Sequence, residues 1–89
     1  MFSVEWLQSA VDELTVIWTR SDSDLRRTIT SATHRIDKTL QADPIGHSES
    51  RSEGRRIMFE SNLGVTFRVD ADRQRVRVLH VWVFRKHRA

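Results

Sequence analysis

The 89-residue sequence contains no cysteine and no tyrosine, one proline and three glycines. Without cysteine, neither disulfide bonds nor thiolate chemistry is available, so packing of the core alone must hold the fold. The three glycines, at positions 46, 54 and 64, lie too far apart to form a dinucleotide-binding or phosphate-binding glycine loop. No apolar run approaches the roughly 18 residues that cross a membrane, and the N-terminus lacks the basic start of a signal peptide. We therefore expect a cytoplasmic protein with no membrane partner.

Charge is distributed unevenly along the chain. Residues 1–50 carry five basic and eight acidic side chains, whereas residues 51–89 carry ten basic and four acidic ones. Thirteen of the fifteen basic residues are arginine, which grips phosphate or carboxylate with two parallel hydrogen bonds. The second half therefore predicts an anionic partner, either nucleic acid or an acidic polypeptide. A genome rich in arginine codons is the alternative explanation.

Apolar periodicity predicts the elements of one domain spanning residues 1–89. The clearest is a helix with the apolar stripe Leu25, Ile29, Ala32, Ile36 and Leu40, which Asp43-Pro44 should stop. The other expected elements are a strand over 2–6, a helix from Leu7 to about Arg20, a polar loop over 45–54, and strands over 55–60, 65–70 and 75–85. The expected fold is α+β in two layers, of order β-α-α-β-β-β, with a helical hairpin packed on one face of a small, mostly antiparallel sheet.

Alternation along the strands predicts which side chains share a face. In the last strand the even positions, including His80 and Trp82, are bulkier, so we expect them to face the helices. In the strand at 55–60, we expect Ile57 and Phe59 to face inward. The open face would then carry four arginines, namely Arg56, Arg68, Arg77 and Arg85. Such a face suits the phosphate backbone of a nucleic acid. The alternative is a solvated face with scattered charge. A slip of one residue in the strand register would exchange the two faces.

The sequence offers few groups for proton transfer. Cleavage of RNA through the 2′-hydroxyl needs a base, an acid and a cation, and arginine supplies only the cation because it does not deprotonate in proteins. Glu49 and His47 lie in the loop expected to border the open face, His80 is expected to be buried, and His87 lies in a basic tail. The tryptophan and phenylalanine residues have core spacing, so we expect them in the core rather than in an RNA-stacking site. Four scattered histidines without cysteine predict no metal site and no cofactor.

Several segments resemble one known family. They are the runs 54–60, 64–70 and 76–82, together with the Asp43-Pro44 break after the second helix. These segments resemble the RelE/ParE superfamily, and the resemblance covers nearly the whole chain. That family comprises small toxins of bacterial type II toxin–antitoxin modules, some of which cut mRNA in the ribosomal A site while others poison DNA gyrase. The resemblance implies a cognate antitoxin that wraps a helix or strand over the toxin.

The resemblance also implies roles for individual residues. Arg56, or Arg55 beside it, matches a basic residue on the strand that follows the helices. Arg85 matches the arginine that contacts the scissile phosphate in the nucleases. With Glu49 and His87 as candidates for proton transfer, the candidate catalytic set is Arg56, Arg85, Glu49 and His87. The candidate RNA-binding set is Arg51, Arg55, Arg68 and Arg77.

Two departures from the nuclease pattern keep three interpretations open. Gly64 stands where the nucleases have an arginine, and the chain has no tyrosine for the C-terminal acid, with only His87 nearby. The first interpretation is a ribosome-dependent mRNA interferase that binds ribosome and mRNA. The second is a toxin that poisons DNA gyrase without chemistry of its own. The third is a non-toxic member of the family that serves only as an antitoxin-binding partner.

Overall fold

The computed structural model describes residues 1–84, so the candidates Arg85 and His87 lie outside the described residues. The expected order of elements is present, with two short additions between the helices and the second half of the sheet. The elements are β1 (Ser3–Trp6), α1 (Gln8–Thr19), α2 (Ser23–Ala42), β2 (Glu49–Ser50), a 3-10 turn η1 (Ser52–Gly54), β3 (Arg55–Glu60), β4 (Leu63–Asp70) and β5 (Arg75–Val83). The polar loop expected over 45–54 therefore contains a short edge strand.

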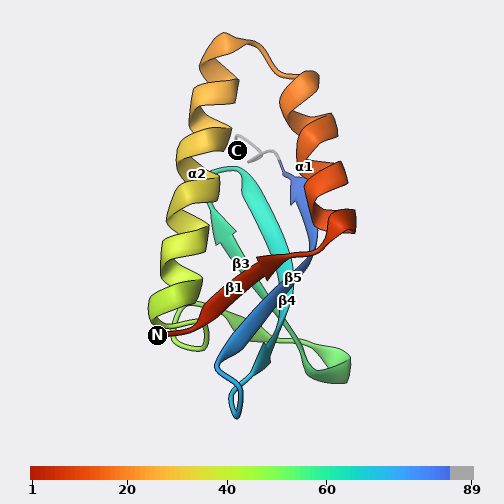
Figure 1. Cartoon of the computed structure of the whole chain (residues 1–89). Coiled ribbons are helices and arrows are strands. Elements are labelled where there is room, and N and C mark those ends of the chain that lie inside the picture. The colour runs from red at the N-terminus through yellow and green to blue at the C-terminus, as the bar shows by residue number, and fades with distance from the viewer. Residues whose placement is uncertain (85–89) are drawn as a thin grey trace, which may run out of the picture.

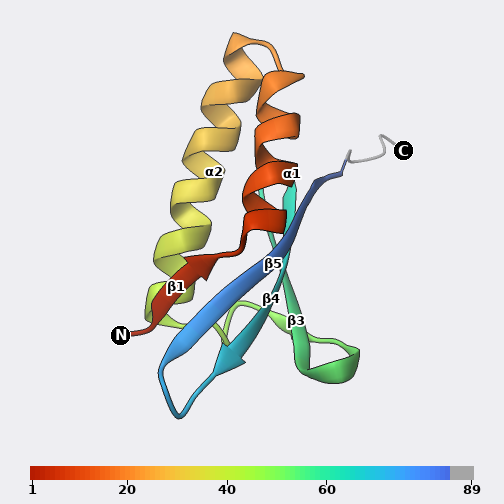
Figure 2. The same cartoon turned by 45° about the vertical axis from the view of Figure 1, so that its right-hand side comes forward.

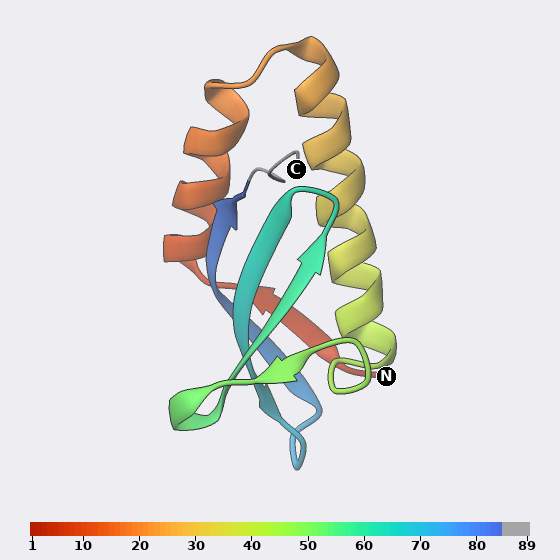
Figure 3. The same cartoon turned by 180° about the vertical axis from the view of Figure 1, so that it is seen from behind.

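The sheet has five strands in the order β1-β5-β4-β3-β2. β1 runs parallel to β5, and every other pair of neighbours is antiparallel. Figures 1 and 2 show both helices over one side of this twisted sheet, and Figure 3 shows β2 beside β3 at the edge opposite β1. The predicted two-layer α+β architecture is confirmed, and its second side has no covering layer among the described residues.

The core lies between α2 and the central strands. The apolar stripe of α2 is buried as its spacing predicts, and it packs on side chains of β3, β4 and β5. The buried set is Ala10, Ile29, Ala32, Ile36, Leu40, Met58, Leu63, Val65, Phe67, Val76, Val78 and Val81. Removing each large side chain of this set from water contributes about 1.5–3 kcal/mol, which is how a chain without disulfides stays folded.

The turn between the helices is held by specific contacts. Asp22 caps α2 by accepting a hydrogen bond from the backbone N–H of Leu25 (2.8 Å). Arg26 donates to the last carbonyls of α1, those of Trp18 (2.9 Å) and Thr19 (3.1 Å). Its guanidinium also lies 4.3 Å from the centre of the Trp18 ring. These contacts satisfy the otherwise unpaired carbonyls at the end of α1 and fix the hairpin.

A β-bulge changes the faces in β5. His80 lies opposite Thr66 and Val78 lies opposite Phe67, so Leu79 is an extra residue without a partner in β4. Before the bulge, even positions of β5 face the helices; after it, odd positions do. The prediction that His80, Trp82 and Phe84 face the helices is therefore wrong. α1 supports the bulge, because the Ser9 hydroxyl donates to the Leu79 carbonyl (2.8 Å).

The faces of β3 also differ from the prediction. Met58 lies opposite Val65 and is buried, whereas Phe59 lies opposite Gly64 and is half exposed. Ile57 and Phe59 therefore point to the open face. The reason lies in β5, because the bulge brings Trp82 to that face and gives Phe59 an aromatic neighbour outside the core.

Candidate nucleic-acid interface

Three arginines form one row across the open face of the sheet. Arg55 of β3 lies opposite Arg68 of β4, which in turn lies opposite Arg77 of β5. Side chains of directly opposed residues project from the same face, so the three guanidinium groups share the open side. We call this set the arginine row. The prediction that Arg68 and Arg77 share the open face is confirmed, and Arg55 occupies the place expected for Arg56.

Few acidic groups balance the arginine row. Glu53 pairs with Arg55, and Glu5 lies 3.4 Å from the Arg77 Nε. The hydrogen bond from Arg55 and the charge of that guanidinium hold the pKa of the Glu53 carboxyl below its usual range. Within the described part of the chain, Arg68 forms no ion pair, whereas Arg55 binds Glu53 and its buried Nε is not accessible to a ligand. The row therefore has donors available for an anion.

A small hollow extends the arginine row toward the β4–β5 turn. It has a volume of about 220 Å³ and is lined by Arg68, Val69, Asp70, Arg73, Arg75 and Arg77. Asp70 organises the turn by accepting the backbone N–H of Arg73 (3.2 Å). Four guanidinium groups thus surround a space with one carboxylate in its lining.

Arg56 does not join this face, and its predicted place there is wrong. It lies opposite Phe67, on the side of the sheet that faces the helices. Its Nε donates to the Ser48 hydroxyl (2.7 Å), and its Nη2 donates to the carbonyls of Ser48 (3.2 Å) and Ile45 (3.4 Å). These contacts bind the loop after α2 to β3. Because its donors are used in this loop, the role of Arg56 in the structure is to hold the loop.

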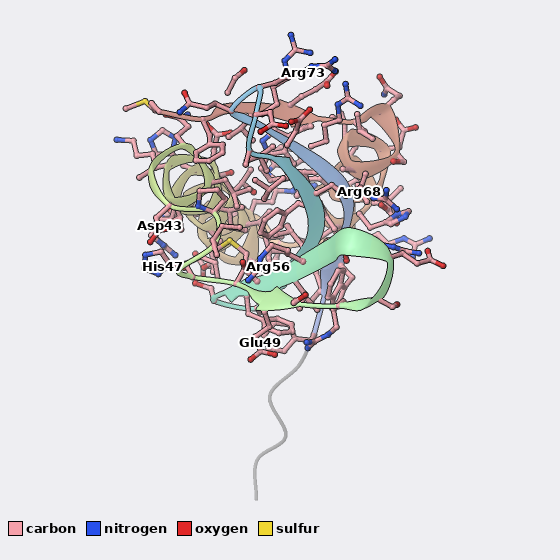
Figure 4. The ribbon with its side chains drawn as sticks, turned by 90° about the horizontal axis from the view of Figure 1, so that it is seen from below. Asp43, His47, Glu49, Arg56, Arg68 and Arg73 are labelled. Atoms are coloured by element: carbon pink, nitrogen blue, oxygen red, sulfur yellow. The ribbon has the colours of Figure 1, made fainter. Side chains whose placement is uncertain are left out.

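The remaining loop candidates are divided between two places. Glu49 lies opposite Ile57 at the β2 edge, so it borders the open face as expected. Its carboxylate pairs with Arg51 (3.1 Å), which is exposed. His47 lies instead with Asp43 beside the end of α2, far from Arg68 in the view of Figure 4. The structure thus brings Glu49 and Arg51 together and leaves His47 outside the arginine row.

A histidine–carboxylate pair on the open face was missed by the sequence reasoning. The Nδ1 of His80 lies 3.1 Å from Glu13 Oε1, an oxygen that also accepts the backbone N–H of Val81 (3.4 Å). The His80 side chain is about half exposed. With Nδ1 held by Glu13, its Nε2 is the nitrogen left for a ligand. The sequence hint was that both the odd and the even positions of β5 include apolar residues, and this pattern does not locate the bulge.

Three aromatic side chains occupy the far end of the open face. The Phe59 ring stands nearly perpendicular to the rings of Trp82 (6.2 Å between centroids, 88°) and Phe84 (5.0 Å, 81°). We call these residues the aromatic cluster. Half of Phe59 is exposed, so its predicted place in the core is wrong. Gly64 gave a hint, because a glycine inside a strand often marks close approach of another group.

The helix layer carries a larger, mostly apolar groove between α1 and α2. Its volume is about 730 Å³, and its lining includes Trp6, Leu14, Trp18, Ile29 and Asp37. The indole N–H of Trp6 donates to Asp37 Oδ1 (3.0 Å) at its floor. Among residues 1–84, no cluster of three or more side chains has the composition to hold a metal ion, and no helix is long and apolar enough to cross a membrane.

The elements and their order define a class of protein with a helical hairpin on one side of a mixed five-stranded sheet. No protein-family model and no curated protein sequence matches the chain. Several solved structures, in contrast, superpose on the chain over most of its length. A chain of the toxin–antitoxin complex RelBE2 from Mycobacterium tuberculosis superposes with a TM-score of 0.73 at 15% identity, covering 93% of this chain and 91% of that one.

Two further structures agree. A chain of the chromosomal ParDE toxin–antitoxin system from P. aeruginosa has a TM-score of 0.73 at 17% identity, covering 96% of this chain and 98% of its own. The isolated RelE toxin from E. coli has a TM-score of 0.65 at 14% identity, covering 98% and 88%. The chain therefore has the RelE/ParE toxin fold, and the fold expected from its resemblance to that superfamily is confirmed.

Proposed function

We propose that this chain is the toxin of a bacterial type II toxin–antitoxin module. We propose further that it acts in the cytoplasm on translation, as a ribosome-dependent mRNA interferase. The fold supports the first part of the proposal, and the arginine row supports the second. The row is the observation that carries the choice of RNA as the target.

The three opposed arginines carry more positive charge than Glu5 and Glu53 balance, and like charges in this arrangement repel one another and destabilise a sheet. A bound polyanion would remove that repulsion. Each guanidinium matches a phosphate with two parallel hydrogen bonds, and Arg68, exposed at the centre of the row, suits this use. The adjoining hollow adds Arg73 and Arg75 to the same surface. Together they favour the phosphate backbone of RNA over a neutral ligand.

Cleavage needs further groups around this surface. A base takes the proton of a 2′-hydroxyl, the resulting oxygen attacks phosphorus, and the 5′-oxygen leaves with a proton from an acid, giving a cyclic phosphate. Guanidinium groups of the arginine row would stabilise the charge that develops on the phosphate. Glu49, at the edge of the open face, remains the proposed base, and His80 with its Glu13 partner is a second candidate. Arg85 and His87 keep the roles implied by the family resemblance.

A toxin that poisons DNA gyrase without nuclease chemistry is the second candidate, and the departure at Gly64 from the nuclease pattern favours it. At Gly64, where nuclease relatives are expected to have an arginine, the Trp82 indole fills the space above the backbone. That end of the open face is therefore apolar rather than charged. A non-toxic chain that only binds an antitoxin would share this feature.

The partner we propose in every case is a cognate antitoxin. The groove between α1 and α2 presents an apolar lining with the Trp6 indole at its base and exposed Trp18 at its rim. An apolar segment of an antitoxin would bury this surface and gain free energy in proportion to the area removed from water. Association of the chain with the product of an adjacent small gene would test this part.

The function is tested by inducing the chain alone in a bacterial host while growth is followed and mRNA 5′ ends are mapped. We expect growth arrest and new mRNA ends with the wild type, and loss of both with Arg68→Gln combined with Arg77→Gln. Arg27→Gln is the matched control, because Arg27 is a strongly exposed arginine on α2 outside the arginine row.

Each other outcome of this experiment favours a different one of the three proposed functions or removes the arginine row from the mechanism. Growth arrest with intact transcripts and a DNA-damage response would replace the interferase by the gyrase poison. Normal growth with soluble, folded chain would favour the non-toxic antitoxin partner. Arrest that persists unchanged in the double arginine variant would remove the arginine row from the mechanism.

A further inference from the structure

The aromatic cluster lies on the open face of the sheet, outside the hydrophobic core. Phe59 is 50% exposed, although it lies in a strand whose other face contributes Met58 to the core. Its contacts with Trp82 and Phe84 are perpendicular aromatic pairs on the solvent side of the sheet. Trp82 and Phe84 beside it are partly exposed, so the three rings form one continuous apolar patch, and such a patch rimmed by polar residues marks an interaction site more often than single apolar residues do.

The backbone at Gly64 is adapted to this cluster. A Cβ at Gly64 would lie 2.5 Å from Cε2 and 2.6 Å from Cζ2 of the Trp82 ring. The backbone conformation at Gly64 does not itself require glycine, since its φ is not positive. Glycine at this position therefore serves the close approach of the indole, which fixes Trp82 beside Phe59 on the open face.

We infer that the aromatic cluster stacks an unpaired nucleobase of the single-stranded nucleic acid whose phosphates lie on the arginine row. This inference rests on the proposed RNA-binding function and adds a base-binding site to it. Aromatic side chains stack any base, because every base has a π-face, and they commonly act together with a basic surface that follows the backbone.

The two parts of the open face have a spacing that one strand of nucleic acid can span. Trp82 lies five residues beyond Arg77 along β5, which corresponds to roughly 13–16 Å with one residue taken up by the bulge. Between them lie Thr66, His80 and, at the edge, Glu49, which offer hydrogen-bonding groups to base edges. A segment of a few nucleotides would thus contact cations at one end and rings at the other.

Charge favours a nucleotide over an apolar peptide as the occupant. The side chains that share the open face with the cluster are cationic in the arginine row and in the adjoining hollow. A polyanion with aromatic bases matches both parts at once, whereas an apolar peptide would match only the cluster.

The experiment uses the full chain and two fluorescent single-stranded probes of equal length and charge. One is a decamer of deoxyadenosine, which cannot be cleaved through a 2′-hydroxyl, and the other is an abasic decamer with the same phosphates. The variants Phe59→Ala, Phe59→Leu and Phe59→Tyr are titrated by fluorescence anisotropy. Val16→Ala is the matched control, since Val16 is a similarly exposed apolar side chain (49%) on α1 and does not line the groove between the helices.

We expect Phe59→Ala and Phe59→Leu to weaken binding of the deoxyadenosine decamer by about tenfold, the range for loss of one stacked base. Phe59→Tyr should stay within about twofold of wild type, since it keeps the ring. None of these variants should change binding of the abasic probe. Val16→Ala should bind both probes as the wild type does.

Two results would overturn the inference, and they differ from failure of the proposed function. Wild-type affinity in Phe59→Leu would show that apolar area and not ring stacking matters. Equal losses on both probes would show a structural effect of the substitution. If the double variant Arg68→Gln and Arg77→Gln binds both probes as the wild type does, the arginine row and thus the proposed RNA binding fails, whatever the aromatic variants do.

Discussion

The two sides of the sheet are built from the same strands but have opposite compositions. In β4, Val65 and Phe67 have no exposed surface and contact the helices, while the alternating residues Thr66 and Arg68 face the other side. The helix side is closed by packing, and its residues are constrained by volume. The open side carries charges and rings that contribute little to packing. This difference indicates that residues constrained by packing alternate along the same strands with residues that packing leaves free.

The largest expected effect concerns the closed side. Phe67→Ala should lower the free energy of unfolding by about 3–5 kcal/mol, because it removes a fully buried ring and leaves a cavity. That is a large part of the total stability of about 5–15 kcal/mol typical of a domain. Urea or thermal unfolding measures the loss. Thr66→Ala, the neighbour on the open side, is the matched control, with a change below about 1 kcal/mol; equal losses in the two variants would contradict the comparison.

A smaller effect is expected at Arg56, which belongs to the closed side despite its charge. Arg56→Met should lower the free energy of unfolding by about 1–3 kcal/mol, since it removes charged hydrogen bonds to Ser48 and to the loop carbonyls. Binding of the abasic phosphate probe should not change. A loss of phosphate affinity without a loss of stability would return Arg56 to the set of ligand-binding residues.

The smallest expected effect is a gain at Glu53, which competes for Arg55 on the open side. Arg55 lowers the pKa of the Glu53 carboxyl, so the pair is intact above the usual pKa of that group and is lost only as the pH falls through the lowered value. Glu53→Gln should therefore bind the abasic probe up to severalfold more tightly at neutral pH. The advantage should vanish in titrations below the lowered pKa, where wild-type Glu53 is also neutral. Weaker binding by Glu53→Gln would show that Glu53 positions Arg55 instead.

The fold could be predicted well because its determinants are local and periodic. The stripe of α2, the stop at Asp43-Pro44 and the alternation in β4 each specify one element and one face. The short strand β2 escaped prediction because Glu49 and Ser50 are polar and pair only through their backbone with β3. Such pairing depends on a neighbour that is distant in the sequence, and composition does not reveal it.

The arrangement of the candidate site residues on the sheet was predicted in part. Arg68 and Arg77 were placed together because alternation in β4 and in the first half of β5 is regular. The faces of Arg55 and Arg56 were predicted the wrong way round, because both faces of β3 carry apolar residues. Only the contact between Phe59 and Trp82 determines which face of β3 is the open one. His80 and its Glu13 partner were out of reach, since they are 67 residues apart and meet only because of the bulge.

The bulge at Leu79 has a consequence for how such chains diverge. It acts as a shift of phase within one strand: upstream of it, the residues that alternate into the core are even, and downstream they are odd. Deletion of Leu79 would remove the bulge and leave residues 80–83 on their present faces, because Val78 and His80 already point to opposite sides of the sheet. A strand of the same length that paired regularly through Leu79 would instead turn His80 and Trp82 toward the helices, so two chains of equal length can present different surfaces according to whether this bulge forms.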